Sequence, residues 1–143
     1  LAHKMGGAFG LPHGLLIAIA MPQVIRFNAK RPQKLALWPH YETYHATKDY
    51  ADLARFIGLK GNTDEELAEA YAQKYIDVAH ECGVTLSLKA NGVSREEFDK
   101  VVDELAVLAY EDQCTTTNPV EPLVSQLKEL LERCYNGTGV EEN

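Results

Sequence analysis

Apolar side chains recur at three- and four-residue steps almost without a break from Thr47 to Tyr135. Apolar residues at such steps line one face of an α-helix. The sequence contains no alternating apolar–polar run longer than four residues and no Val/Ile-rich segment bounded by turns, the two patterns typical of strands. We therefore predict an all-α fold.

Capping motifs mark where two of the predicted helices begin. Thr63-Asp-Glu-Glu66 and Ser94-Arg-Glu-Glu97 are capping boxes, in which the hydroxyl and the last Glu side chain can each accept an amide proton left free at a helix start. The first box opens a helix that is expected to run to about Cys82 and to end at Gly83. Its predicted inward stripe consists of Leu67, Tyr71, Tyr75, Val78 and Cys82.

Other segments complete the expected order of elements. A short helix over residues 50–57 ends at Gly58, and a turn at Asn91-Gly92 precedes the helix of the second capping box. Residues 112–119 are expected to form a polar loop, because β-branched threonines followed by Asn-Pro disfavour helix continuation. A polar tail over residues 136–143 follows a final amphipathic helix. The apolar positions of the last two helices are Phe98, Val101, Val102, Leu105 and Leu108, then Leu123, Leu127, Leu130 and Cys134.

Length, charge and cysteine content argue against several classes of function. A chain of 143 residues fits one domain, and its net charge of −7 with a pI near 5.2 argues against a nucleic-acid partner. The longest wholly apolar run has seven residues, 15–21, whereas a membrane span needs about twenty. Three widely spaced cysteines give neither a disulfide framework nor a metal-binding knuckle, so we expect a reducing, cytoplasmic location.

The first 29 residues differ from the rest of the chain. Four glycines fall within residues 6–14, and they predict a flexible approach to a helix over residues 15–28. The first half of that helix is apolar around most of its circumference, so we expect it to be buried on all sides. Pro22 is expected to kink or split it. A domain this small has little structure with which to enclose a helix next to a glycine-rich segment. We therefore predict that this helix is the floor of a cleft, and that another part of the protein or a partner covers it.

Two histidines, His3 and His13, lie close to these glycines, and His13 stands just before the apolar helix. There, His13 meets the positive end of the helix dipole, which favours the neutral imidazole that can bind a metal. The structural alternative is that His13 only caps the helix, and His3 is open to a similar interpretation. Neither residue type nor position decides between these alternatives.

The remaining histidines carry no comparable signal. His40 and His45 fall within residues 30–46, where aromatic residues and two prolines predict a surface excursion between helices. His80 with Cys82 offers too few ligands for a zinc site, which needs about four. We therefore expect no functional role for these three histidines.

Several motifs together resemble the iron-dependent (group III) alcohol dehydrogenases. They begin with Ala2-His3-Lys4-Met5-Gly6 and Pro12-His13-Gly14, which are followed by the apolar helix and Val24-Ile25-Arg26-Phe27-Asn28. The similarity continues through Asp112-Gln-Cys114-Thr and Asn118-Pro119 into the terminal helix, so it covers essentially the whole chain. Within the family, the chain is most similar to the C-terminal end of the bifunctional aldehyde-alcohol dehydrogenases, which fuse an acylating aldehyde dehydrogenase to the iron enzyme. The segments that carry this closer similarity are Lys34-Leu-Ala-Leu-Trp-Pro-His-Tyr41, Asp49-Tyr50-Ala51 and Phe56-Ile57-Gly58-Leu59.

The resemblance implies a particular site. In that family an N-terminal α/β nucleotide-binding domain and a helical C-terminal domain enclose a cleft, where one Asp and three His hold divalent iron. Residues 1–143 would then be the helical domain, incomplete at its N-terminus, with the nucleotide-binding domain absent from this chain. By position His13 is one iron ligand, and the other three fall upstream of Leu1. His3 matches a histidine near the nicotinamide that is proposed to relay the alcohol proton, and Cys114 matches a cysteine near the substrate pocket.

The implied function is that of an iron- and NAD-dependent alcohol dehydrogenase interconverting a short-chain aldehyde, such as acetaldehyde, and its primary alcohol. Its partners would be the missing nucleotide-binding domain, the substrate and further copies of the parent enzyme in a homo-oligomer. We expect the chain alone to be inactive, because one imidazole supplies too few ligands to retain iron. The alternative is a free-standing helical interaction domain, in which His3 and His13 are incidental.

Overall fold

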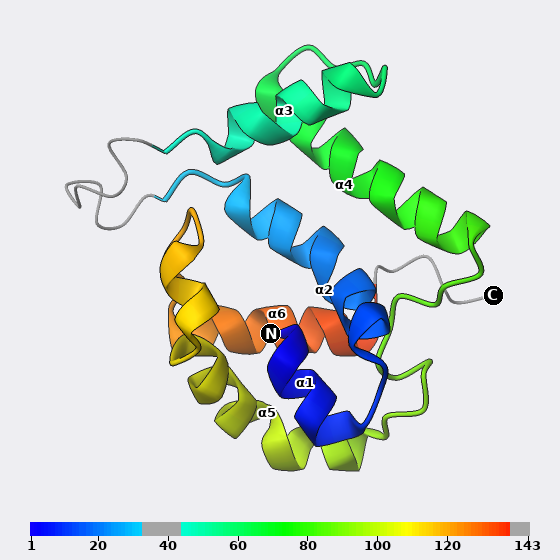
Figure 1. Cartoon of the computed structure of the whole chain (residues 1–143), viewed down its shortest axis with the longest axis vertical. Helices are drawn as coiled ribbons and strands as arrows, with labels where there is room; N and C mark the ends of the chain where they lie inside the picture. The colour runs from blue at the N-terminus through cyan, green and yellow to red at the C-terminus, as the bar shows by residue number, and fades with distance from the viewer. Residues whose placement is uncertain (33–43, 138–143) are drawn as a thin grey trace.

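The computed structural model describes residues 1–32 and 44–137, and in these ranges the chain forms helices and no strands (Figure 1). The predicted all-α fold is therefore confirmed for the described residues. The elements in chain order are α1 (Ala2–Phe9), α2 (His13–Asn28), α3 (Ala46–Phe56), α4 (Asp64–Glu81), α5 (Arg95–Tyr110), the 3-10 helix η2 (Gln113–Thr117) and α6 (Val124–Asn136).

The capping motifs act largely as their sequences predict. Ser94 forms a complete capping box with Glu97, because each side chain accepts a backbone N–H of the other residue. The Thr63 hydroxyl accepts the N–H of Glu66 at 3.1 Å, whereas the Glu66 carboxylate accepts from the N–H of Asn62 rather than that of Thr63. Of the two hydrogen bonds of the predicted first box, the one accepted by Thr63 is present, and it marks the start of α4.

Helix α2 is the centre of the arrangement. It contacts α1 and α6 on one side of the molecule and the packed pair of α3 and α4 on the other (Figure 1). Helix α5 packs against α6 and α1. The main apolar core fills the space between α1, α2, α5 and α6, where Phe98 is fully buried and its ring centroid lies 4.6 Å from that of Tyr135.

The buried face of α4 differs from the predicted stripe. Leu67 is buried as expected, but Tyr71 and Tyr75 are only partly buried, and Val78 and Cys82 are exposed. Helix α4 packs against both α3 and α2, so the face that meets them carries small side chains that allow close approach. The buried residues of α4 are Leu67, Ala68, Ala72, Ile76 and Ala79. A similar shift in α5 leaves Leu108 38% exposed and buries Ala106 and Ala109.

The glycine-rich N-terminal segment is helical, so the prediction of a flexible approach was wrong. Gly6 and Gly7 lie inside α1, which is fastened to the core by the fully buried side chain of Met5. Burial of this side chain offsets the weak helix propensity of glycine. Gly10 ends the helix with φ +65°, a left-handed conformation that glycine adopts without a steric penalty.

Helix α2 begins two residues earlier than predicted, at His13, with Pro12 as its N-cap. Pro22 lies inside it and does not split it, contrary to one of the two expected outcomes. The expected excursion over residues 30–46 lies mostly outside the described residues. Helix α6 continues through Asn136, and the rest of the predicted polar tail, apart from Gly137, also lies outside them.

Among the described residues, no helix combines the length and the apolar character needed to cross a membrane.

Candidate active-site cavity

A cavity of about 330 Å³ opens between α1, α2, η2 and α6. Its volume falls at the lower end of the range of small-molecule sites. The three site residues predicted from sequence, His3, His13 and Cys114, all line it. They come from three elements, so the fold brings together residues that the sequence spreads over most of its length.

Helix α2 contributes an apolar stripe to the cavity wall. Ile17, Met21, Val24 and Phe27 follow one another at steps of four and three residues, the spacing of a single helix face. Ile17 is 38% exposed, and the other three are partly buried. Within the described residues α2 is not buried on all sides, because one apolar face borders the cavity. That open face agrees with the predicted floor of a cleft, and what covers it stays a prediction.

His3 and His13 meet at one edge of the cavity. Their imidazole rings are stacked, with centroids 4.9 Å apart and planes within 9° of parallel. His3 lies in the first turn of α1 and His13 is the first residue of α2, so the turn around Gly10 folds one onto the other. Both side chains are exposed, which leaves ring nitrogens accessible from the cavity.

Asp112 connects α1 to the loop after α5. One carboxylate oxygen accepts the backbone N–H of Cys114 at 2.9 Å, and the other lies 3.1 Å from Lys4 Nζ and 3.9 Å from His3 Nδ1. The Cys114 N–H and, second, the Lys4 ammonium lower the pKa of Asp112 to about 2. The carboxylate therefore keeps its negative charge beside the cavity at every physiological pH.

Asp112 is a site residue that the sequence analysis did not single out. In the sequence it stands out only as part of the motif Asp112-Gln-Cys114-Thr. The sequence does carry a signal for the local role of this residue. An Asp that follows a helix commonly accepts the backbone N–H of the residue two positions later, and this hydrogen bond begins a turn. The contact with Lys4 and His3 had no sequence signal, because it depends on how α1 packs against α5.

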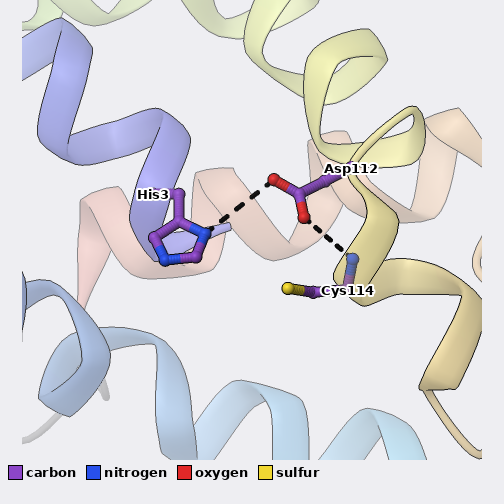
Figure 2. A group of neighbouring side chains, drawn as sticks. All are labelled: His3, Asp112 and Cys114. Atoms are coloured by element: carbon purple, nitrogen blue, oxygen red, sulfur yellow. Dashed lines mark hydrogen bonds and ion pairs between the residues drawn. The ribbon is translucent and has the colours of Figure 1, made fainter.

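Cys114 lies in the first turn of η2, with its thiol exposed. Figure 2 shows the sulfur directed toward the imidazole of His3, while the Asp112 carboxylate lies beside both groups. Thr115 holds this turn against α5 by donating its hydroxyl hydrogen to the carbonyl of Ala109 at 2.7 Å. Donor atoms of His3, Asp112 and Cys114 all lie within 4.8 Å of one another.

An amide pair fastens the far end of the cavity wall. Asn28, at the end of α2 and only 3% exposed, exchanges two side-chain hydrogen bonds with Asn118, at 3.0 and 2.8 Å. Asn118 also donates to the carbonyl of Val120 at 2.6 Å. These contacts join α2 to the segment that follows η2, so the two motifs Val24–Asn28 and Asn118-Pro119 meet in space.

Among the described residues, the two other histidines, His45 and His80, do not line this cavity. His45 is the exposed N-cap of α3, where it pairs with Asp49, and His80 lies in α4. His40 lies outside the described residues. That these histidines have no functional role stays a prediction.

Comparison with known proteins shows the family of this chain. Residues 1–135 match the model of the Fe-containing alcohol dehydrogenase family, C-terminal part. An aldehyde-alcohol dehydrogenase of Streptococcus pneumoniae is 41% identical over 137 residues, which are 96% of this chain and 16% of that protein. An NADPH-dependent butanol dehydrogenase of Clostridium saccharobutylicum is 33% identical over 141 residues, 99% of this chain and 33% of that protein. This chain therefore spans between a sixth and a third of these relatives.

A solved structure supports the same relationship at the level of the fold. The iron-containing alcohol dehydrogenase of Thermococcus thioreducens superposes with a TM-score of 0.73 and 30% identity. The superposition covers 94% of this chain and 30% of that one. The helical arrangement described above therefore corresponds to part of a larger structure in that protein.

Proposed function

This chain belongs to the Fe-containing alcohol dehydrogenase family, as its C-terminal helical part, and on that premise we propose that it forms one wall of an alcohol dehydrogenase active site. The reaction is the interconversion of a short-chain aldehyde, such as acetaldehyde, and its primary alcohol, with iron and NAD as cofactors. The observation that carries this proposal is the convergence of His3, His13 and Cys114 on one cavity with an apolar wall.

The parent polypeptide in this proposal is a bifunctional aldehyde-alcohol dehydrogenase. Support comes from the relative in Streptococcus pneumoniae, whose name includes both activities and of which this chain matches 16%. The nucleotide-binding domain would then belong to the part of the polypeptide outside this chain. NAD follows from the resemblance to that subgroup, whereas the butanol dehydrogenase relative uses NADPH by its name, so both nucleotides belong in the test.

His13 is the residue of this chain that would hold iron. It stands at the N-terminus of α2, its side chain is exposed, and it lines the cavity, so its imidazole is free to meet ligands from another domain. The other three ligands would come from outside the chain. Iron, when bound, supplies a Lewis acid that stabilises the negative charge of an alkoxide or polarises an aldehyde carbonyl.

His3 would carry the alcohol proton. Its ring is 61% exposed and stacked on that of His13, so it can take a proton at a ring nitrogen in the cavity and release it to water. The Asp112 carboxylate lies 3.9 Å from His3 Nδ1 and would help to orient the imidazole in the cavity. Ile17, Met21 and Val24 would exclude water from the hydrocarbon part of the substrate, and Cys114 would border the same pocket.

The alternative, a free-standing helical interaction domain, receives no support from the family match. Two further parts of the proposal concern assembly and location. Assembly of the parent enzyme into a homo-oligomer rests on the family resemblance alone. A cytoplasmic location is supported by the three cysteines, all of which are free thiols.

The test uses the complete polypeptide that carries this chain, with His13→Ala compared with His45→Ala, an exposed histidine away from the cavity. We expect His13→Ala to lose bound iron and aldehyde reduction with NADH or NADPH, and His45→Ala to keep both. Iron by mass spectrometry and cofactor absorbance are the measurements. Full iron content and turnover in His13→Ala would refute the ligand assignment, and tight stoichiometric iron on the 143-residue chain alone would refute the need for other ligands.

A further inference from the structure

The cavity holds a second group of potential metal ligands, apart from His13. His3, Asp112 and Cys114 bring an imidazole nitrogen, a carboxylate oxygen and a thiol sulfur within 4.8 Å of one another (Figure 2). These are the three ligand types that Zn²⁺ binds in proteins. We propose that these three residues form a binding site for zinc or a similar soft divalent cation, distinct from the iron site to which His13 belongs.

The geometry needs only a small adjustment to hold such an ion. Zinc lies about 2.0 to 2.3 Å from nitrogen, oxygen and sulfur ligands. The three ligand atoms lie no more than 4.8 Å apart, so they surround a common central point. Small rotations about side-chain bonds would bring each ligand atom to a zinc-binding distance from that point. Three protein ligands leave the fourth tetrahedral position for water, and the open cavity gives water access to it.

The ligands are held in place before any ion arrives. The backbone N–H of Cys114 fixes the Asp112 carboxylate at 2.9 Å, and the Thr115 hydroxyl fastens the same turn to α5. His3 is positioned by its stacking on His13. A site assembled from restrained side chains loses less conformational entropy on binding than one built from mobile side chains.

Lys4 occupies part of this position in the ion-free protein. Its ammonium lies 3.1 Å from the Asp112 oxygen that also faces His3. A divalent cation would displace this single charge, and the Cys114 thiol would release its proton to water as the sulfur–metal bond forms. Affinity should therefore increase as the pH rises and as Lys4 is removed.

The consequence for catalysis rests on the proposed function. An ion held by His3 takes up the nitrogen that would carry the alcohol proton, and it ties down the thiol in the pocket. The site would therefore be inhibitory, and zinc would inhibit the parent enzyme without displacing its iron.

Cobalt(II) is the probe that tests the site directly, because a cobalt–thiolate bond adds a charge-transfer absorption that oxygen and nitrogen ligands do not give. The protein is the complete iron-loaded polypeptide that carries this chain. We expect one equivalent of cobalt to produce the band, Cys114→Ser to abolish it, and His3→Ala to weaken binding at least about tenfold, since even outer-shell changes cost that much. Lys4→Ala should strengthen binding several-fold.

Matched controls are available in the same chain. Cys82→Ser removes the other exposed thiol, and His45→Ala removes an exposed imidazole that also faces an aspartate, Asp49. Both variants should keep the band at full strength. A band that survives Cys114→Ser, or disappears with Cys82→Ser, would overturn the proposal, as would no cobalt band at all in the unaltered protein.

Two further measurements keep the result decisive. Zinc should protect Cys114 of the unaltered protein from alkylation, as read by peptide mass spectrometry, and unchanged labelling would overturn the proposal without any variant having to fold. His13→Ala should lose iron and still show a cobalt band, although with weaker binding, because His3 loses the ring on which it stacks. If His13→Ala loses iron and shows no cobalt band, only the zinc-site inference is refuted. If His13→Ala keeps its iron and shows the cobalt band, only the assignment of His13 as an iron ligand is refuted.

Discussion

The two apolar faces of helix α2 differ in what covers them. On one face, Leu16 and Ile19 are fully buried against α1, α5 and α6. On the other, Ile17, Met21 and Val24 border a cavity that the described residues leave open. Adjacent side chains of similar size and hydrophobicity thus have opposite surroundings within one turn of helix.

The difference separates the part of the helix that stabilises the fold from the part available for binding. Fully burying an aliphatic side chain contributes about 1.5–3 kcal/mol to stability. The side chains of the cavity face are less buried, so they contribute less to stability. Their apolar atoms remain available to contact a ligand or another domain. An apolar wall with a few convergent polar groups is the usual composition of a small-molecule site.

The largest expected effect compares neighbouring residues on the two faces. Leu16→Ala should lower the free energy of unfolding by about 2–5 kcal/mol, because it leaves a void in a closely packed core. Ile17→Ala should cost about 1 kcal/mol or less, because its side chain already borders open space. Urea titration of both variants, followed by circular dichroism, gives the two values. Similar losses would show that the cavity face is buried after all.

The next effect concerns the amide pair that fastens the cavity wall to α2. Asn118→Ala removes both hydrogen bonds to Asn28, which is almost fully buried, and should cost about 1–3 kcal/mol. The double change Asn28→Ala with Asn118→Ala should cost less than the sum of the two single changes, since no buried amide is then left without its partner. Urea titration of the four proteins provides the comparison. Strict additivity would mean that the pair does not stabilise the wall.

The smallest expected effect is the pH dependence contributed by Asp112. Its pKa is lowered from 3.8 to about 2 in the folded chain, so its stabilising contribution is present above pH 3.8 and disappears as the pH falls through 2. The unaltered chain should therefore be more stable than Asp112→Asn at pH 5, and the difference should shrink steadily toward pH 2. Thermal unfolding across this pH range measures it. A difference that stays constant with pH would exclude the carboxylate charge as its source.

Local sequence predicted the ends of elements better than their packed faces. The capping box at Ser94 and the stop at Gly83 are both present, because a cap depends on residues within one turn of each other. The predicted stripe of α4 was wrong at Val78 and Cys82, because the buried face follows from where α2 and α3 lie. Helix α1 was missed for a related reason, since its glycines are held helical by the burial of Met5 in a core distant in sequence.

Local patterns in the sequence were enough to predict the helical class, most helix ends and the motifs that mark the family. They also point to His3, His13 and Cys114 as candidate site residues. Contacts between distant segments bring Asp112 to these residues, stack the two imidazoles and leave one apolar face of α2 open. The reason is physical: propensities and caps act over a few residues, whereas charge pairing and burial depend on segments that meet only when the chain folds.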